Sequence, residues 1–279
     1  MLKADLHIHT TLSDGMLSPE KLIELALDTD LDVIAITDHD TSEAVSRART
    51  AALETPLEVL RGVEISTRYE NKELHLLAYG YEENDMIRHL FSGQKKRRTK
   101  RAEMMISRLN GMGFDISMDE VIGESGAGLP GRPHIARVLI RKGYAATMQE
   151  VFFRYLGDRS PICQQIDYPD TEEAIRMVHS AGGLAVLAHP AGSVNMITLG
   201  KLCQSGLDGV ECYHPSHNST HQRKYLQFCD NYGLLVTGGS DFHGSTADYY
   251  RFGKTHIMLE DTSPLLQYTS RIQKQTVQH

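Results

Sequence analysis

Seven short apolar segments, separated by helical patterns, limit this chain to a small number of folds. Such segments are typical of buried strands. They cover residues 4–8, 33–37, 59–65, 74–79, 184–188, 209–212 and 234–238. Ser18-Pro19 predicts a helix that begins there and ends near Leu27, and residues 41–52 and 171–180 show similar patterns. The alternation predicts an α/β fold with a mostly parallel sheet, either open or closed into a barrel.

Residues 81–159 interrupt this alternation. They contain no convincing strand, and helical patterns cover residues 86–109, 118–122, 133–141 and 147–156. We therefore expect a helical, substrate-binding insertion at 81–159, between the fourth and fifth strands of one domain formed by 1–80 and 160–279. Residues 81–160 hold 14 Lys and Arg against 10 Asp and Glu, although the whole chain has a net charge of −7. A basic segment beside an acidic remainder favours an anionic substrate.

The composition, 41% hydrophobic and 23% charged, is that of an ordinary globular protein. The first residues lack the apolar core of a signal peptide, and no apolar run is long enough to span a bilayer. The four cysteines form no Cys-x-x-Cys pair, so we expect reduced thiols, with a zinc site as the alternative. These features predict a cytoplasmic protein without a membrane partner, and they indicate no obligate protein partner.

Histidines and acids recur where the predicted strands end. His7 and His9 lie two residues apart, so on a strand both side chains point to the same side. In α/β barrels the active site is built from the carboxyl ends of the strands. One histidine at such a place is usually structural, but six or seven strand ends that carry them predict a metal centre. The candidate ligands are His7, His9, Asp14, His39, Glu64, His75, His189, Asp241 and His243.

Imidazole and carboxylate ligands suit Zn, Mn or Fe(II) rather than a soft thiolate site. Three acids and six histidines are too many for one tetrahedral ion, so we expect two or three divalent ions, with Glu64 as a possible bridge. We expect manganese, with zinc and iron as alternatives. Asp38, beside His39, would either orient an imidazole or cap buried groups, and both interpretations stay open.

These motifs resemble the PHP (polymerase and histidinol phosphatase) family, within the wider amidohydrolase group. The resemblance covers about 1–80 and 160–279. It rests on His7-Ile8-His9, Asp14-Gly15, Thr37-Asp38-His39-Asp40, Gly62-Val63-Glu64-Ile65-Ser66, Ala188-His189-Pro190 and Ser240-Asp241-Phe242-His243. It implies a distorted (β/α)7 barrel with a trinuclear metal site. The implied groups are His7, His9, Glu64 and Asp241; Glu64, His75 and others; and Asp14, His39, His189 and His243.

The insertion is similar to that of one subfamily, because it carries Lys95-Lys96-Arg97-Arg98 and Gly131–Arg137. Members of that subfamily remove the 3′-phosphate from nucleoside 3′,5′-bisphosphates and leave 5′-mononucleotides. Related members act as 5′→3′ exonucleases on short RNAs. The resemblance therefore implies a nucleotide 3′,5′-bisphosphate or short single-stranded RNA as substrate. The alternatives are a small-molecule phosphomonoesterase, as in the histidinol phosphatase branch, and a metal- or RNA-binding module without catalysis.

Two residues at the start of a predicted helix, Arg132 and His134, are candidates for gripping a 5′-phosphate, because a helix N-terminus with a nearby arginine binds phosphate well. The alternative is a surface arginine and a capping histidine. Arg98 and Arg101 belong to a basic run that would bind substrate electrostatically, unless it is only a solvated helix face.

His214, at the sixth strand end, is the candidate general acid for the leaving 3′-oxygen, because imidazole titrates near neutral pH. The alternatives are that His214 only lines the pocket or that His217, which would otherwise bind substrate, takes this role.

Overall fold

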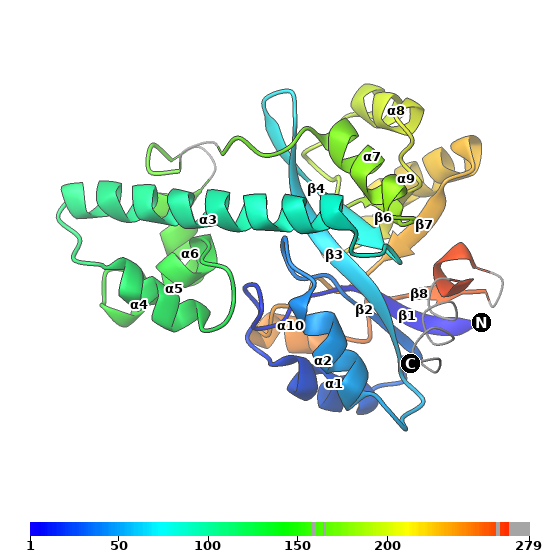
Figure 1. Ribbon diagram of the computed structural model, residues 1–279, viewed down its shortest axis with the longest axis horizontal. Helices are drawn as coiled ribbons and strands as arrows, with labels where there is room; N and C mark the ends of the chain where they lie inside the picture. The colour runs from blue at the N-terminus through cyan, green and yellow to red at the C-terminus, as the bar shows by residue number, and fades with distance from the viewer. Residues whose placement is uncertain (158–159, 164–165, 261–262, 268–279) are drawn as a thin grey trace.

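A mixed β-sheet forms the centre of the molecule. The computed structural model describes residues 1–157, 160–163, 166–260 and 263–267. Within them the sheet has eight strands in the order β7-β6-β5-β4-β3-β2-β1-β8 (Figure 1). The strands are β1 (Leu2–Ile8), β2 (Val33–Ile36), β3 (Glu58–Tyr69), β4 (Lys72–Tyr79), β5 (Leu184–Leu187), β6 (Gly209–Tyr213), β7 (Leu235–Gly238) and β8 (Ile257–Leu259). All seven predicted strands are present, and β8 was not predicted.

The sheet is nearly closed into a barrel. The backbone N–H of His9, after β1, donates to the carbonyl of Phe242, after β7, at 2.9 Å. Gly239 lies directly against β1 in this seam, and an added Cβ there would lie 2.4 Å from the backbone nitrogen of His7. The α/β barrel-like fold predicted from the sequence is therefore confirmed, with one more strand than the seven expected.

Strand β4 departs from the mostly parallel order, because it runs antiparallel to both β3 and β5. It follows β3 after only Glu70 and Asn71, and such a short connection cannot carry the chain back for a parallel strand. As a result the amino-terminal part of β4, rather than its carboxyl end, meets the rim where the parallel strands end. His75 reaches that rim for this reason.

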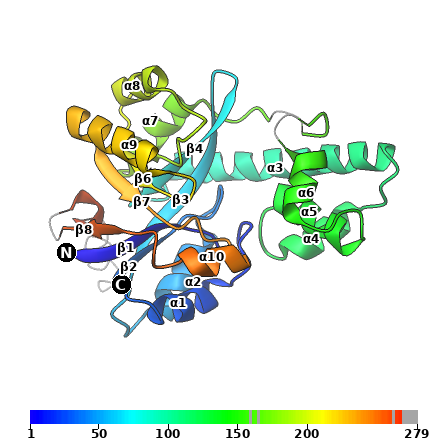
Figure 2. The same ribbon diagram turned by 180° about the vertical axis from the view of Figure 1, so that it is seen from behind.

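The helices outside the insertion cover the outer surface of the sheet (Figure 2). The three that were predicted form as α1, α2 and α7. Ser18 caps α1 by accepting a hydrogen bond from the backbone N–H of Lys21, and α1 packs with α2 over β1 and β2. The bounds are α1 (Pro19–Leu27), α2 (Glu43–Ala51), α7 (Thr171–Ser180), α8 (Met196–Gln204), α9 (Ser219–Tyr232) and α10 (Thr246–Arg251). None of the described helices is long and apolar enough to cross a membrane.

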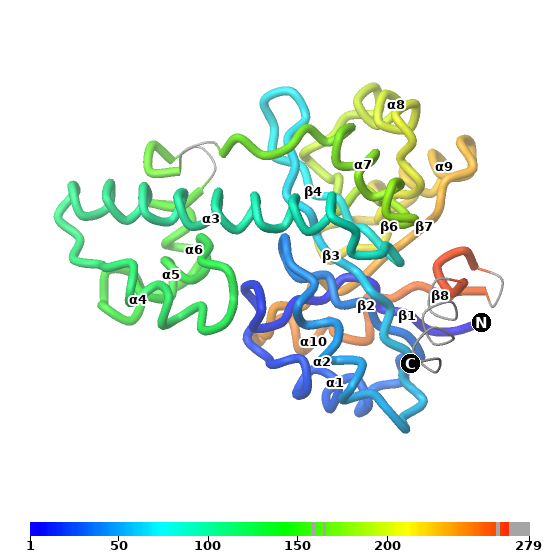
Figure 3. The backbone as a smooth tube through the Cα atoms, in the orientation of Figure 1, coloured from blue at the N-terminus to red at the C-terminus, as the bar shows by residue number. Residues whose placement is uncertain are grey.

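The long helix α3 leaves the barrel and carries the other helices of the insertion at its far end (Figures 1 and 3). The elements are α3 (Asp85–Gly111), α4 (Met118–Ser125), α5 (Arg132–Arg141), α6 (Met148–Val151) and the π-helix η1 (Phe152–Leu156). They share an apolar cluster of their own, which includes Met105, Leu109 and Leu139. The four predicted helical ranges all form. The predicted end of the insertion at 159 and the last residues of the barrel, 268–279, lie outside the described part of the chain.

Candidate metal centre

The carboxylate of Glu64, on β3, lies at the centre of a cluster of histidines and is 1% exposed. Its Oε2 lies 3.3 Å from His7 Nε2, 3.2 Å from His9 Nε2 and 3.2 Å from His39 Nδ1. Asp241 Oδ1, just after β7, lies 3.3 Å and 3.2 Å from the same nitrogens of His7 and His9. His7, His9, Glu64 and Asp241 form a first group, which can hold one cation.

The other oxygen of Glu64 faces a second pair of histidines. Its Oε1 lies 2.7 Å from His75 Nδ1 and 2.8 Å from His189 Nε2. Each carboxylate oxygen thus belongs to a different group, which is the arrangement expected of a residue that bridges two cations. The resemblance implied that His189 belongs with Asp14, but β5 pairs with β4, and the backbone N–H of Ala188 donates to the carbonyl of His75. This pairing places His189 beside His75 instead.

Asp14 forms the third group with residues from the opposite side of the cluster. Its Oδ1 lies 3.3 Å from His243 Nε2, and its Oδ2 lies 3.9 Å from His39 Nε2. His9 also belongs to this group, since its Nδ1 lies 3.7 Å from Asp14. The structure therefore brings all nine predicted ligands together.

The donor atoms of this cluster fit divalent cations. The buried nitrogens His7 Nε2, His9 Nε2 and His39 Nδ1 have no hydrogen-bond partner among the described residues, although carboxylate oxygens lie nearby. Three sets of donor atoms lie within 4.8 Å of one another: those of His7, His9, Glu64 and Asp241, those of His9, Asp14, His39 and His243, and those of His39, Glu64 and His75. A shared cation with bonds of about 2.0–2.2 Å would draw such donors slightly closer together. Nitrogen and oxygen donors of this kind suit Mn, Zn or Fe(II).

The charge of the cluster also favours cations. Burial by itself would raise the pKa of Glu64, but the charges of His39, His75 and His7 hold this pKa well below its usual value. The same balance of burial against histidine charge keeps the pKa values of Asp14 and Asp241 low. The three carboxylates are therefore ionised and offer the negative charge that metal ions neutralise.

Three residues at or near the cluster have a strained backbone conformation. Asp40, His189 and Asp241 have φ values of 56°, 25° and 51°, in the region that residues other than glycine seldom adopt. Such strain persists only where the surrounding structure imposes it, and it concentrates at functional sites. Here it lies shortly after β2, β5 and β7. The chain turns the side chains of His189 and Asp241 into the cluster and that of Asp40 toward Ser66 and Arg98.

Two buried acids support the ligands, and the sequence analysis missed both. Glu211 on β6 accepts from His7 Nδ1 (3.0 Å) and from the backbone N–H of His189 (2.8 Å). Asp5 accepts from the backbone N–H groups of His7 (3.3 Å) and Ser240 (2.9 Å), and burial raises its pKa to about 7. A hydrogen bond from a carboxylate to the other nitrogen of a ligand imidazole fixes its tautomer and orientation. The sequence signal that could have identified Asp5 and Glu211 is a single acidic residue within an otherwise apolar strand.

Asp38 supports a loop rather than an imidazole ring. It accepts from the Thr10 backbone N–H (2.7 Å), the Thr10 hydroxyl (2.6 Å) and the Ser13 hydroxyl (2.5 Å). We call residues 10–15 the Asp14 loop. The hypothesis that Asp38 orients His39 is therefore not favoured, and Asp38 positions the loop that presents Asp14.

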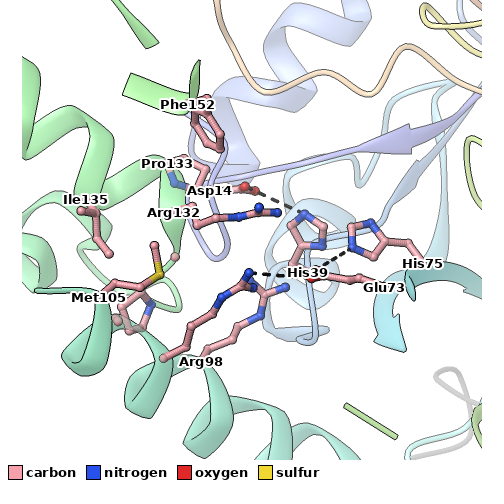
Figure 4. Close-up of a pocket in the computed structure, with 14 residues that line it drawn as sticks. Asp14, His39, Glu73, His75, Arg98, Met105, Arg132, Pro133, Ile135 and Phe152 are labelled. Carbon is pink, nitrogen blue, oxygen red and sulfur yellow. Dashed lines mark hydrogen bonds and ion pairs between the residues drawn. The ribbon is translucent and has the colours of Figure 1, made fainter. Parts of the chain in front are cut away.

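A basic cleft with a volume of about 540 Å³ opens beside the third group (Figure 4). Arg98, Arg101 and Arg132 line it on the side of the insertion, together with Phe152. Arg98 Nε donates to Asp40 at 2.6 Å, and Arg101 Nη1 donates to the Tyr168 hydroxyl at 3.1 Å. These contacts hold the guanidinium groups in place at the cleft wall.

His134 does not resemble a direct phosphate ligand. It is 1% exposed, and its Nδ1 accepts from the backbone N–H of Gly131 at 3.0 Å. Burial lowers its pKa to about 4, so the ring is neutral at physiological pH. The capping alternative is favoured for this residue.

A second cleft, with a volume of about 690 Å³, opens on the other side of His75. Glu73 and His75 line both clefts, whereas His214 and Asp241 line the second one. His214 Nε2 lies 3.2 Å from Asp241 Oδ2, and its Nδ1 accepts from the backbone N–H of Ser216 at 3.0 Å. In the neutral ring this leaves the proton on Nε2, where it donates to Asp241.

His217 lies behind His214 and is 6% exposed. Its Nδ1 donates to the carbonyl of Cys212 at 3.0 Å, and the two imidazole rings have centroids 5.4 Å apart. This position favours a packing role over the predicted contact with substrate.

The comparisons with known proteins agree with this geometry. The PHP domain family matches residues 5–208. A 5′-3′ exoribonuclease Rnm of Salmonella typhimurium is 36% identical over 86% of this chain and 84% of its own length. A phosphoribosyl 1,2-cyclic phosphate 1,2-diphosphodiesterase of Eggerthella lenta is 31% identical over 86% and 94%. A 3′,5′-nucleoside bisphosphate phosphatase of Chromobacterium violaceum is 29% identical over 87% and 88%. The solved structure of an amidohydrolase from Chromobacterium violaceum, with bound sulfate, matches with a TM-score of 0.85 at 27% identity over 96% of both chains.

Proposed function

Because this chain belongs to the PHP family of metal-dependent phosphoesterases, we propose that it removes the 3′-phosphate of nucleoside 3′,5′-bisphosphates and leaves 5′-mononucleotides. The family assignment made from the motifs is thereby confirmed. A family of phosphoesterases also favours an enzyme over a non-catalytic binding module. We propose manganese as the metal, with two or three ions per chain, and residues 81–159 as the substrate-binding part.

The basic cleft is the observation that carries this proposal. Three arginines line it, and the ligands Asp14, His39 and His75 form its inner end. A substrate with one phosphate at the metal centre and a second one a nucleoside away would place that second phosphate among the arginines. Guanidinium groups bind phosphate with short, charge-assisted hydrogen bonds. Phe152, which is half-buried, adds an apolar surface to the wall of the cleft.

Metal ions bound at such a centre supply an activated water and neutralise the charge that develops on the phosphate. The protein's own residues position the reactants. Arg132 at the start of α5 binds the 5′-phosphate, and Arg98 and Arg101 complete that end of the cleft. Glu211 fixes the orientation of His7 through a hydrogen bond, and Asp38 holds the Asp14 loop. Water adds to phosphorus as the bond from phosphorus to O3′ breaks. One proton of that water ends on O3′, and the other stays with the released phosphate or passes to solvent.

The position of His214 changes its proposed role. It lines the second cleft, whereas a nucleoside held by the arginines lies in the basic cleft with its O3′ on that side. This geometry does not favour His214 as the proton donor to O3′. We propose that it is a positioning residue, because its Nε2–H group orients the carboxylate of Asp241.

Phosphate release from adenosine 3′,5′-bisphosphate tests the proposed function, with 3′-AMP and 5′-AMP as controls. We expect release that requires added Mn²⁺, gives 5′-AMP and is faster than release from 3′-AMP. Equal rates on the bisphosphate and 3′-AMP would contradict the binding of a second phosphate and favour the small-molecule phosphomonoesterase. Absence of turnover with any metal would contradict the proposal itself.

The second cleft favours a second candidate function, 5′→3′ exonuclease action on short RNAs. A phosphomonoester has one organic group, but a phosphodiester has two, and two clefts meet at this centre on either side of His75. Leu74, Ala191 and Ser193 give the second cleft an apolar and neutral polar lining. The Lys72 ammonium, which donates to the Ser193 carbonyl at 3.2 Å, adds a cation nearby. This lining suits the ribose and base of a following nucleotide.

Substitution Ala191→Phe tests this second candidate, because it fills the second cleft without touching a ligand. We expect cleavage of a 5′-phosphorylated diadenylate to fall about fivefold to a hundredfold, as overpacking costs about 1–3 kcal/mol. Release from adenosine 3′,5′-bisphosphate should stay within about twofold, since it needs only the basic cleft. Ile197→Phe, at a position on α8 that is 74% exposed, is the matched control. Equal losses on both substrates would contradict the exonuclease role of the cleft.

A further inference from the structure

Arg137 has no part in the function proposed so far, although it belongs to the Gly131–Arg137 motif. It lies on α5, and its Nη2 donates to the backbone carbonyl of Asp14 at 2.6 Å. Asp14 is a candidate ligand of the third group. One hydrogen bond thus joins the insertion to the residue that presents a carboxylate to the metal centre.

Two further contacts join the insertion to the Asp14 loop. His134 accepts from Gly131 through Nδ1, and its ring also hydrogen-bonds the backbone of Ser13. Gly128 lies so close to the loop that an added Cβ would be 2.6 Å from the Ser13 carbonyl oxygen. The insertion therefore contacts this loop at two successive residues, Ser13 and Asp14.

The insertion also reaches the other side of the third group. Arg98 on α3 forms an ion pair with Asp40, at 2.6 Å, and Asp40 follows His39 directly. Gln94 on the same helix donates to Asp40 at 3.0 Å. Two ligands of the third group, Asp14 and His39, are thus carried on segments that the insertion holds. Apart from His39, the histidines beside Glu64 lie on or just after strands of the barrel: His7 and His9 with β1, His75 on β4 and His189 after β5.

We propose that the insertion assembles the third metal site and that Arg137 is the positioning residue that joins the two. Without this hydrogen bond no side chain of the insertion holds the backbone of Asp14 itself, and the Asp14 carboxylate no longer has a fixed position relative to His243. Affinity at the third site then falls, while the sites around Glu64 keep theirs. This holds whichever phosphate ester the enzyme cleaves.

The test is Mn²⁺ titration of the metal-stripped full chain, with free Mn²⁺ followed by electron paramagnetic resonance. Arg137→Met should weaken one class of site at least about tenfold, the size typical for groups that orient ligands, and leave the other sites unchanged. Arg137→Lys, which keeps a donor, should restore part of the loss. Arg141→Met, one turn further along α5, is the matched control, because Arg141 pairs with Glu124 away from the centre.

A double variant identifies the site that is affected. His243→Ala removes a ligand of the third group, so adding Arg137→Met to it should cause no further loss. Additive losses in the double variant would overturn the proposal, as would an unchanged isotherm in Arg137→Met. Equal weakening of every site, with a lower unfolding temperature, would show only a structural role and would also overturn it.

Discussion

Glu64→Gln should remove metal from the centre and lower phosphoesterase activity by about a thousandfold or more. The two oxygens of Glu64 face different groups, with His7, His9 and His39 near Oε2 and His75 and His189 near Oε1. Glutamine keeps the shape of the side chain but replaces one carboxylate oxygen by an NH2 group, which cannot bind a cation. Metal catalysis contributes several kcal/mol to a reaction of this kind, and about 1.4 kcal/mol corresponds to a factor of ten.

Metal content by mass spectrometry and initial rates measured together test this expectation. Glu58→Gln, six residues earlier on β3 and outside the cluster, is the matched control and should keep both metal and activity. Circular dichroism establishes that the variant is folded. A folded Glu64→Gln protein with full metal content and normal rates would show that Glu64 is not a bridging ligand.

The fold was predictable where one local pattern decides it. Each buried strand is an apolar run, and Ser18-Pro19 sets the start of α1. Strand β8 was missed because it spans only Ile257–Leu259. Its pairing with β1 also depends on a contact between segments that are far apart in the sequence. The direction of β4 depends on the short connection after β3, which an apolar pattern does not reveal.

The clustering of the candidate metal ligands was predictable because their side chains are costly to bury without a partner. Nine such residues, most of them at or just after strand ends, have few explanations besides a shared centre. Their grouping was not predictable, since it depends on which strands are neighbours, and this misplaced His189. Glu211 and Arg137 were missed for a related reason. Their roles rest on contacts with residues far along the chain, to His7 and to the Asp14 carbonyl.

The clefts explain why substrate residues were harder to assign than ligands. Arginine on a helix is usually solvated, and only the fold shows that Arg98, Arg101 and Arg132 face one cavity. His134 lies only two residues after Arg132 in the same motif, but its side chain is buried. The separation of His214 from the arginines likewise follows from the order of β4, β5 and β6 in the sheet.

Arg132→Ala should lower kcat/KM for adenosine 3′,5′-bisphosphate by about tenfold to a hundredfold. Hydrogen bonds to charged groups contribute about 1.5–3 kcal/mol, and each 1.4 kcal/mol is about a factor of ten. The rate on 3′-AMP, which has no 5′-phosphate, should change by less than about threefold, because the interaction removed is absent from that substrate. Affinity for Mn²⁺ should not change, since Arg132 lines the cleft without belonging to a ligand group.

The substrate ratio decides what Arg132 does, and Arg141→Ala on the same helix is its matched control. A loss confined to the bisphosphate places the 5′-phosphate at the start of α5. Equal losses on both substrates would mean that Arg132 acts on the phosphate that is attacked. No loss on either substrate would indicate that Arg98 and Arg101, on the α3 side of the same cleft, bind the 5′-phosphate instead. Because all three arginines belong to the insertion, this ratio also tests whether the insertion sets substrate choice.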